Sequence, residues 1–264
     1  MSRQPEIGQI PESVAADLKA VEQEIDAAEA ELVKFSARLH EPIFAKRAQV
    51  LDKIEQFWPQ ALTNCVSTNV YIDDDDHALL NSLTKIDVKR DAADPRAATI
   101  EFHFAPNDYI SDAVLTKEFK LDPKAGPFSS QFDFAAETIP QKSEIHWKSD
   151  AKNLAKLKPT VGDLKEIDVD AEEEDDEEED DFEPGSFFSS FFDSQSRQVA
   201  GSIGRAIVED LYPNAVQHYE QPSLFEDDDE DDEDDEEDEE EDDDDDREID
   251  LEEEEKRPSK KARK

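Results

Sequence analysis

A heptad pattern of apolar residues near the N-terminus limits the folds open to this chain more than any other feature. Apolar residues follow one another at alternating spacings of four and three, at Val14, Leu18, Val21, Ile25, Ala28, Leu32, Phe35 and Leu39. This spacing places them on one stripe of an α-helix and is typical of a coiled coil. Ser13 is a suitable N-cap for that helix. We call this apolar stripe the seam.

The predicted helix continues past Pro42. After a slip of one residue the apolar pattern resumes at Ile43, Val50, Ile54 and Phe57, which indicates a bend rather than an end. A helix from Val14 to Trp58 would be roughly 68 Å long at about 1.5 Å per residue. Because no second long heptad is available to cover the seam, we expect a second copy of the same helix to do so. The alternative is that the seam folds back on the chain's own domain.

The period of the pattern changes after this helix, and alternation predicts β-strands. Apolar and polar residues alternate in "TKIDVKR" (84–90), "ATIEFHFAP" (98–106) and "AVLTKEFKLD" (113–122), which are separated by short turn-forming loops. A further candidate strand is "SEIHW" (143–147), and "DHALLNSL" (76–83) is a predicted short helix. Sequential strands joined by short loops favour an antiparallel sheet, so the predicted fold class is α+β.

Two acidic runs carry much of the net charge of −44. Every residue from Glu226 to Asp246 is acidic, and the block from Asp170 to Glu183 holds 12 acids and no base. Neighbouring charges on an extended chain lie about 3.5 Å apart, well inside the Debye length of about 8 Å in physiological salt. Each run therefore repels itself open, and we expect a disordered loop at 170–183 and a disordered tail at 226–255.

A phenylalanine block, "EPGSFFSSFF" (183–192), follows the first acidic run directly. Beyond it, apolar residues recur at helical spacing, at Val199, Ile203, Ile207, Val208 and Leu211. Since amphipathic helices belong to folded domains, we interpret the acidic run as an internal loop. Phe187, Phe188, Phe191 and Phe192 are then expected to begin a helical layer over the sheet. The alternative is a disordered acidic-aromatic interaction motif.

The charge also indicates the kind of partner. A polyacid repels DNA and anionic membranes and attracts proteins rich in Lys and Arg, of which histones are the abundant nuclear example. The alternative for any charge run is a solubilising spacer. The chain ends in a basic cluster that reads as a nuclear localisation signal for an import receptor, made of Lys256, Arg257, Lys260, Lys261, Arg263 and Lys264. The alternative is an electrostatic clasp onto the acidic tail.

The sequence contains none of the common motifs for catalysis or cofactor binding. The histidines lack HExxH spacing, and the glycines form no GxGxxG or phosphate-binding loop. The single cysteine, Cys65, has no basic neighbour and is expected to be a buried, unreactive thiol. The run Asp73–Asp76 lacks the EF-hand glycine and closing glutamate, so we interpret it as a solvated loop. No apolar run is long enough to span a bilayer. We expect a soluble intracellular protein that is not an enzyme and holds no cofactor or metal.

The order of several blocks resembles the nucleosome assembly protein family of histone chaperones, most of all its SET branch. These blocks are "EPIFAKRAQVLDKIEQFW", "VLTKEFKL", "SEIHWKS", an acidic interruption, "EPGSFFSSFFD", "IVEDLYPNAVQHY" and the acidic tail. Each block is short, but their ordered combination over about residues 10–225 is specific. The resemblance implies a dimerisation helix that carries an α+β "earmuff" domain on each subunit. It also implies that core histones bind the concave underside of the dimer and are transferred to and from DNA. It further implies that the protein catalyses no reaction.

This resemblance completes the expected organisation of the chain. The expected parts are a disordered N-terminus at 1–11, the dimerisation helix at 12–60, the earmuff-like domain at 61–225, the acidic tail at 226–255 and the nuclear localisation signal at 256–264. Expected histone contacts are Ser189 in the phenylalanine block, Glu209 and Asp210 in "EDLYP", and the tail acids, represented by Glu226, Asp227 and Asp228.

Two other activities are open to a chain of this kind. The resemblance also allows inhibition of a protein phosphatase, and an acidic cofactor of a histone acetyltransferase is a further alternative. We expect little direct DNA binding and no membrane binding. The expected location is the nucleus, with shuttling through the cytoplasm left open.

Overall fold

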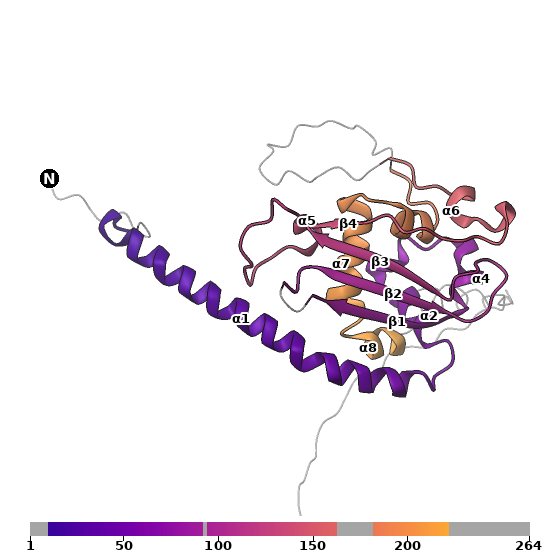
Figure 1. Cartoon of the computed structure of the whole chain (residues 1–264), viewed down its shortest axis with the longest axis horizontal. Coiled ribbons are helices and arrows are strands. Elements are labelled where there is room, and N and C mark those ends of the chain that lie inside the picture. Colours follow the sequence, from indigo (N-terminus) through magenta and orange to yellow (C-terminus); the bar gives the residue numbers. More distant parts are fainter. Residues whose placement is uncertain (1–9, 92–93, 163–181, 222–264) are drawn as a thin grey trace, which may run out of the picture. The chain divides into compact units, whose positions relative to one another are not determined.

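A long helix leads into a small antiparallel sheet in this chain (Figure 1). The computed structural model describes residues 10–91, 94–162 and 182–221. Helix α1 spans Glu12–Leu51, and the strands are β1 (Leu83–Arg90), β2 (Ala98–Phe104), β3 (Val114–Leu121) and β4 (Thr138–Pro140). They form one sheet in the order β1-β2-β3-β4, and each neighbouring pair is antiparallel. The predicted α+β class is therefore confirmed.

Helix α1 crosses Pro42, as predicted, but it ends earlier than its apolar pattern indicates. The helix stops at Leu51, so the prediction of a continuous helix to Trp58 is wrong. Gln56 has a left-handed backbone with φ of 56°, which an α-helix cannot include. A separate helix, α2 (Phe57–Asn64), then begins, and Phe57 and Trp58 are buried in the core of the domain. Phe57 fits the heptad spacing by sequence, but it packs inward.

The first three strands lie where alternation predicts them, whereas the fourth does not. The predicted strand at 143–147 is wrong, because β4 is formed by Thr138–Pro140, which pairs with the end of β3. Within the described residues, 143–147 contributes a single bridge, between Ile110 and Trp147. Its first residue, Ser143, donates its backbone N–H to the carbonyl oxygen of Phe192. The hydroxyl of Ser143 donates to the carbonyl oxygen of Thr116 on β3, so the segment bridges the helical layer and the sheet without adding a strand.

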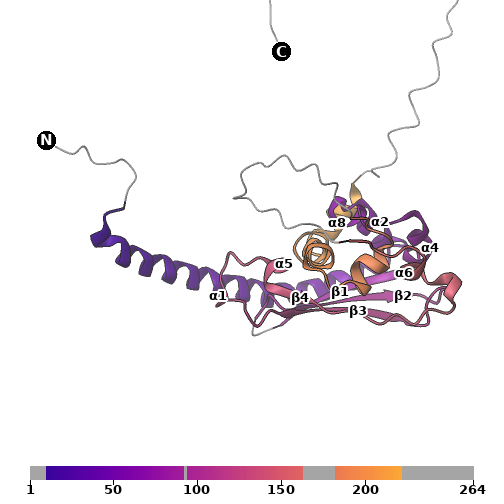
Figure 2. The ribbon, with the colours of Figure 1, turned by 90° about the horizontal axis from the view of Figure 1, so that it is seen from above.

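Helices cover one face of the sheet and leave the other open, as Figure 2 shows. The strand β2 alternates between buried and half-buried residues along its length. Ile100 and Phe102 point into the core, while Glu101 pairs with Lys89 of β1 at 2.5 Å on the outer face. The helical elements other than α1 and α2 are α3 (Val66–Asn69), η1 (Asp74–Asp76), α4 (His77–Leu80), α5 (Phe134–Glu137), η2 (Asp150–Lys152), α6 (Leu154–Leu157), η3 (Phe188–Asp193), η4 (Arg197–Gly201), α7 (Ser202–Arg205), η5 (Ala206–Leu211) and α8 (Ala215–Glu220).

The phenylalanine block forms the centre of the helical layer, which confirms the prediction made for it. All four phenylalanines have 0% exposure. The ring of Phe102 on β2 lies 5.7 Å from that of Phe191 and 5.3 Å from that of Phe192, distances at which aromatic rings attract one another. The alternative of a disordered interaction motif is wrong. The acidic run that precedes the block lies largely outside the described residues.

The interpretation of residues 73–76 as a solvated loop is wrong for Asp76. Its carboxylate is fully buried and accepts hydrogen bonds from the hydroxyl of Ser186 and from the backbone N–H groups of Phe187 and Asp73. Burial raises the pKa of Asp76, and these hydrogen bonds oppose that shift. The carboxylate therefore caps the start of the phenylalanine helix. Local sequence did not indicate this role, because Ser186 and Phe187 come more than 100 residues later.

A second charged group, Lys117 on β3, is buried on the inner face of the sheet. Its Nζ donates to the carbonyl oxygen of Ser194 at 2.7 Å and to that of Phe192 at 3.3 Å, at the end of η3. Burial lowers the pKa of Lys117 to about 7; Asp193 nearby opposes the shift and Lys142 adds to it. The lysine thus satisfies carbonyl groups at a helix end, although the fold disfavours its charged form.

This burial predicts a pH dependence of stability. Because the pKa of Lys117 is lower in the folded chain than its ordinary 10.5, the unfolded chain binds more protons between these values. The free energy of unfolding should therefore rise as the pH increases from 7 to 9, by about 2 kcal/mol from this group, since one pKa unit corresponds to about 1.4 kcal/mol. Denaturation at each pH should show the rise in the wild type and not in Lys117→Met.

The matched control is Lys120→Met on the same strand. The side chain of Lys120 is 65% exposed and points away from the core. This variant should retain the pH dependence of the wild type. A Lys117→Met variant that retained it as well would show that another group causes the effect.

Candidate functional site

The seam of α1 is open to solvent. The exposed fraction of its large residues ranges from 38% for Leu18 to 65% for Leu32, with Val14, Val21, Ile25, Phe35 and Leu39 in between. The buried residues of α1 are Ala30 and Leu51, which lie off the seam. Within the part of the chain that the structure describes, the seam therefore does not fold back on its own domain. A row of exposed apolar side chains on one helix stripe is typical of an interaction surface.

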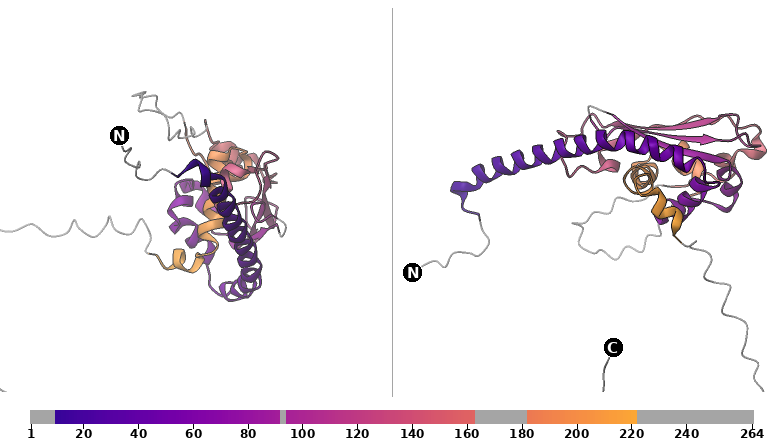
Figure 3. Two further views of the ribbon diagram at one scale, coloured as in Figure 1. Left: turned by 90° about the vertical axis from the view of Figure 1, so that its left-hand side faces the viewer. Right: turned by 90° about the horizontal axis from the view of Figure 1, so that it is seen from below.

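A second stripe of α1 faces the chain's own domain. Half-buried or buried residues recur at Asp26, Ala30, Val33, Ala37, Phe44, Arg47 and Leu51. These positions have the spacing of another helix stripe, displaced around the helix from the seam. Figure 3 shows most of α1 passing along the domain and its N-terminal end extending beyond it. The helix thus attaches to its own domain on one side and presents the seam on another.

The C-terminal attachment of α1 is built around Arg47. Its guanidinium group donates to the carbonyl oxygens of Tyr212 at 2.6 Å and Pro213 at 2.9 Å. It also lies 4.4 Å from the ring centroid of Phe44 and 4.8 Å from that of Tyr212. Tyr212 in turn donates its hydroxyl hydrogen to Asp87 of β1 at 3.1 Å. Burial and the neighbouring Asp87 raise the pKa of Tyr212 to about 12. The helix is therefore joined to the sheet edge through one tyrosine.

The second attachment joins the middle of α1 to the loop between β3 and α5. The carboxylate of Asp26 accepts hydrogen bonds from the hydroxyl of Ser129 at 2.8 Å and from the N–H of Ser130 at 3.1 Å. These bonds lower the pKa of Asp26. The hydroxyl of Ser130 also donates to Glu29 at 2.9 Å, and Nζ of Lys34 lies 5.2 Å from the ring centroid of Phe128. The loop contacts the helix on the side away from the seam.

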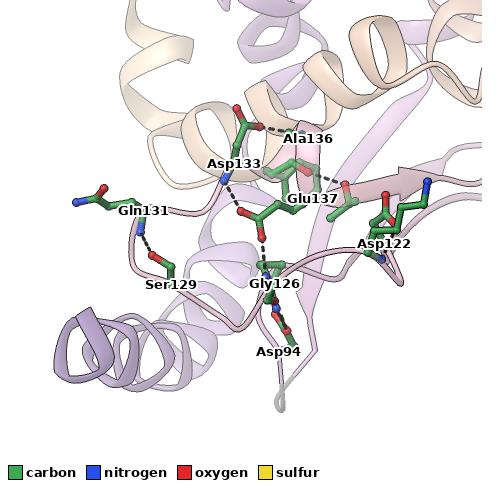
Figure 4. A network of polar contacts seen from close by, with 12 residues as sticks. Asp94, Asp122, Gly126, Ser129, Gln131, Asp133, Ala136 and Glu137 are labelled. Atoms are coloured by element: carbon green, nitrogen blue, oxygen red, sulfur yellow. Dashed lines mark hydrogen bonds and ion pairs between the residues drawn. The ribbon is translucent and has the colours of Figure 1, made fainter. Parts of the chain in front are cut away.

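Arg96 holds this loop in place. The guanidinium group is buried and forms ion pairs with Asp94 at 2.6 Å and Glu137 at 2.5 Å, and it donates to the carbonyl oxygen of Gly126 at 3.1 Å. The two carboxylates raise the pKa of Arg96. Figure 4 shows Glu137 at the centre, where it also accepts from the N–H of Asp133. A buried arginine with all these partners fixes the loop that contacts α1.

The predicted histone contacts lie in different surroundings. Glu209 is exposed near Arg90 and Arg205, and partial burial of its carboxyl raises its pKa while these arginines oppose the shift. Asp210, the next residue in the chain, is half-buried, and Asn214 donates to its carboxylate at 3.1 Å. Glu226, Asp227, Asp228 and the basic residues of the C-terminal cluster lie outside the described residues.

Ser189 is placed differently from Glu209 and Asp210, because only 5% of it is exposed. Its hydroxyl oxygen lies 2.9 Å from the carbonyl oxygen of Lys158, 2.8 Å from that of Ser186 and 2.9 Å from the hydroxyl of Thr160, and its single hydrogen is shared between the two carbonyl acceptors. In the single chain Ser189 therefore joins η3 to the 158–160 segment. Its hydroxyl is already occupied, so a direct contact with a partner would need these bonds to break.

The two attachments of α1 to its domain are contacts that sequence reasoning missed. The spacing of Ala30, Val33, Ala37 and Phe44 could have indicated a second stripe, because apolar residues recur there at helical intervals. No local signal marked Arg47 or Ser129, whose partners are distant in sequence, or the pairing of Arg96 with Glu137.

The described residues include one possible metal-ligand cluster and no helix that could span a membrane. Cys65, Asp210 and His218 bring their ligand atoms within 4.8 Å of one another, the one group of three His, Cys, Asp or Glu side chains near enough to share a metal ion in the described ranges. The helices of the described chain include none with the length and apolar character required to cross a bilayer.

Comparison with known proteins supplies a family match. The family model described as "Nucleosome assembly protein (NAP)" matches residues 14–256. Protein SET of Drosophila melanogaster is 31% identical over 216 residues, which cover 78% of this chain and 73% of that protein. Protein SETSIP of Homo sapiens is 27% identical over 225 residues, covering 85% of this chain and 65% of that protein.

Solved structures with similar folds agree with the family match. Ccp1 is 24% identical with a TM-score of 0.55, and the match covers 78% of this chain and 94% of that one. The Vps75 histone chaperone is 20% identical with a TM-score of 0.55, and the match covers 78% of this chain and 95% of that one. At these identities the likeness concerns the fold, including the long helix that precedes the sheet.

Proposed function

The chain belongs to the nucleosome assembly protein family, and on this basis we propose that it is a histone chaperone. It would bind core histones, shield their charge and take part in nucleosome assembly and disassembly, without catalysing a reaction. The observation that carries the proposal is the charge of the chain, in which 73 acidic residues outnumber 29 basic ones to give a net charge of −44. A surface of this sign favours a strongly basic partner.

Electrostatics explain how such a chaperone would both hold and release a histone. Binding of a basic protein to a dense polyacid releases counterions, as binding to DNA does, and therefore weakens as the salt concentration rises. DNA has a high and regular charge density, so it competes with the polyacid for the histone. The acidic chain would thus prevent unproductive contacts until DNA takes over the histone.

Dimerisation is the second part of the proposal. The exposed seam offers an apolar stripe along α1, and a second copy of the helix is the partner that carries the matching stripe. The Arg47 and Ser129–Ser130 attachments leave this stripe uncovered. In the dimer, each helix would hold its own domain by one stripe and its partner by the other.

Partners and location complete the proposal. We assign histone contact to Glu209, to Asp210 and to the tail acids, and nuclear import to the basic cluster at 256–264. Phosphatase inhibition and support of a histone acetyltransferase remain alternatives. A pull-down with purified core histones in one arm and purified phosphatase in the other distinguishes the proposed function from the first alternative.

Deletion of the acidic tail provides the main test. Removal of 226–264 should weaken core-histone binding at least about tenfold at 0.1 M salt and flatten its salt dependence, because fewer counterions are exchanged. Binding should be measured by a titration of labelled histones from about 0.1 to 0.5 M salt, a range over which screening strengthens. The truncated protein should also fail to accumulate in the nucleus.

The matched control is a deletion of 226–255 that keeps the basic cluster. This variant should bind histones as weakly as the longer deletion but enter the nucleus normally, which assigns transport to the bases and histone binding to the acids. Unchanged histone affinity across the salt range would mean that the tail is only a spacer, and the electrostatic proposal would fail.

A further inference from the structure

We propose that Cys65, Asp210 and His218 form a binding site for one zinc ion. The three residues offer a sulfur, a carboxylate oxygen and a ring nitrogen, and these atoms all lie within 4.8 Å of one another. The proposal goes beyond the proposed function, with which it shares Asp210, and it revises the expectation from sequence that the chain holds no metal.

The packing of the helical layer creates this cluster. Cys65 lies at the junction of α2 and α3, Asp210 on η5, and His218 on α8. Asn64, next to Cys65, donates to the carbonyl oxygens of His218 and Gln221, both at 3.0 Å. This side chain fixes α8 against the end of α2. The three candidate ligands are therefore positioned by contacts other than their own.

His218 supplies the observation that points to a ligand. Only 8% of the residue is exposed, yet neither of its ring nitrogens has a hydrogen-bond partner among the described residues. Nε2 lies 3.2 Å from Oδ1 of Asp210, but this approach lacks hydrogen-bond geometry. Buried polar atoms are nearly always hydrogen-bonded, because an unpaired one costs about 1 to 3 kcal/mol. A metal ion between the nitrogen, the carboxylate and the sulfur would satisfy this group.

The ligand types select zinc. A thiolate and an imidazole suit zinc and disfavour calcium and magnesium, which prefer sets made of oxygen ligands. Three protein ligands leave a fourth tetrahedral position for water. Binding would form Zn–S, Zn–N and Zn–O bonds and release the thiol proton of Cys65 to solvent, with no change of oxidation state. Asp210 is half-exposed, so the ion can reach the site from that side.

Such an ion would link parts of the chain that lie far apart in sequence. Tyr212, which anchors α1 through Phe44 and Arg47, lies between Asp210 and His218. Zinc would therefore join the end of α2 to the segment that holds the long helix. Because an ion that binds only the folded chain stabilises it by mass action, zinc should raise the melting temperature.

Cobalt provides a selective probe, because Cys65 is the single cysteine of the chain. A sulfur-to-cobalt charge-transfer band can then come only from this residue. We expect the full-length protein to show this band on titration with Co²⁺, with a stoichiometry of one ion per chain, and zinc to abolish it. Excess Mg²⁺ in the buffer competes with Co²⁺ for the carboxylates of the polyacidic segments. Co²⁺ bound to those carboxylates would in any case lack the sulfur band.

Variants identify the other ligands. Cys65→Ala should lose the band, and Asp210→Asn and His218→Gln should each weaken Co²⁺ binding at least about tenfold. Asp112→Asn is the matched control, because Asp112 pairs with the exposed His146 at 2.9 Å without a nearby cysteine. It should bind Co²⁺ as the wild type does. Circular dichroism checks that each variant folds. Asp210→Asn should perturb the fold least, because the side chain of Asp210 is only half-buried.

Two results would overturn the proposal. One is the absence of a sulfur-to-cobalt band in the folded wild type. The other is a band of unchanged strength and affinity in both Asp210→Asn and His218→Gln, which would leave Cys65 as a lone sulfur ligand.

Discussion

Replacement of Leu18, Ile25 and Leu32 by glutamate should convert the dimer into a monomer. The three side chains are 38%, 53% and 65% exposed in the single chain, and in the proposed dimer they lie in a dry interface. Each substitution removes apolar contact and places an unpaired charge there, at a cost of several kcal/mol per site. Light scattering should return the mass of one chain for the triple variant and of two chains for the wild type.

The matched control places the same charges elsewhere on α1. Ala16, Ala20 and Ala27 are exposed, and helical geometry puts them away from both the seam and the stripe that contacts the domain. Their triple replacement by glutamate should leave the mass of the dimer unchanged. A seam variant that kept the dimer's mass would show that the seam is not the interface, whereas a control variant that dissociated would indicate a general effect of added charge.

Replacement of one phenylalanine of the block by alanine should cause a large loss of stability. Phe188→Ala removes a ring with 0% exposure that stacks against Phe192 at a centroid distance of 5.9 Å. Large-to-small changes of this kind cost about 3 to 5 kcal/mol, because the cavity they leave is only partly filled. This is a large share of the roughly 5 to 15 kcal/mol that stabilises a typical domain. Chemical denaturation measures the loss.

The comparison is best made in the monomeric seam variant, where dimerisation does not add to the unfolding free energy. There Phe35→Ala is the matched control, since Phe35 is 52% exposed and should lose less than about 0.5 kcal/mol. Equal losses from Phe188→Ala and Phe35→Ala would contradict the assignment of the phenylalanine block to the core.

Periodicity predicted the larger elements well. The alternation of Ile100, Phe102 and Phe104 along β2 and the recurrence of Val199, Ile203 and Ile207 in the helical layer both matched the structure. These patterns record which side of an element is apolar, and that property is present in the sequence itself. The match to a known family depends on the same local blocks, read in order.

The end of α1 and the position of the fourth strand could not be read in this way. The heptad pattern includes Phe57, but burial of Phe57 and Trp58 in the core turns the chain inward before the pattern ends. The alternating segment at 143–147 has strand character, yet the helical layer holds its first residue through Phe192. In both places a tertiary contact outweighed a local preference.

Some features of the candidate site could likewise be predicted from the sequence, whereas others required the tertiary structure. The sequence alone determined that the long helix carries an apolar seam and that the chain is strongly acidic, because spacing and charge are properties of the residues in order. Only the tertiary structure decided that Asp76 is buried beneath Ser186, that Arg47 attaches α1 through Tyr212, and that Cys65 meets His218. Each of these pairs is separated by more than 100 residues, so its members come together only when the sheet and its helical layer pack, and no local pattern records which residues then become neighbours.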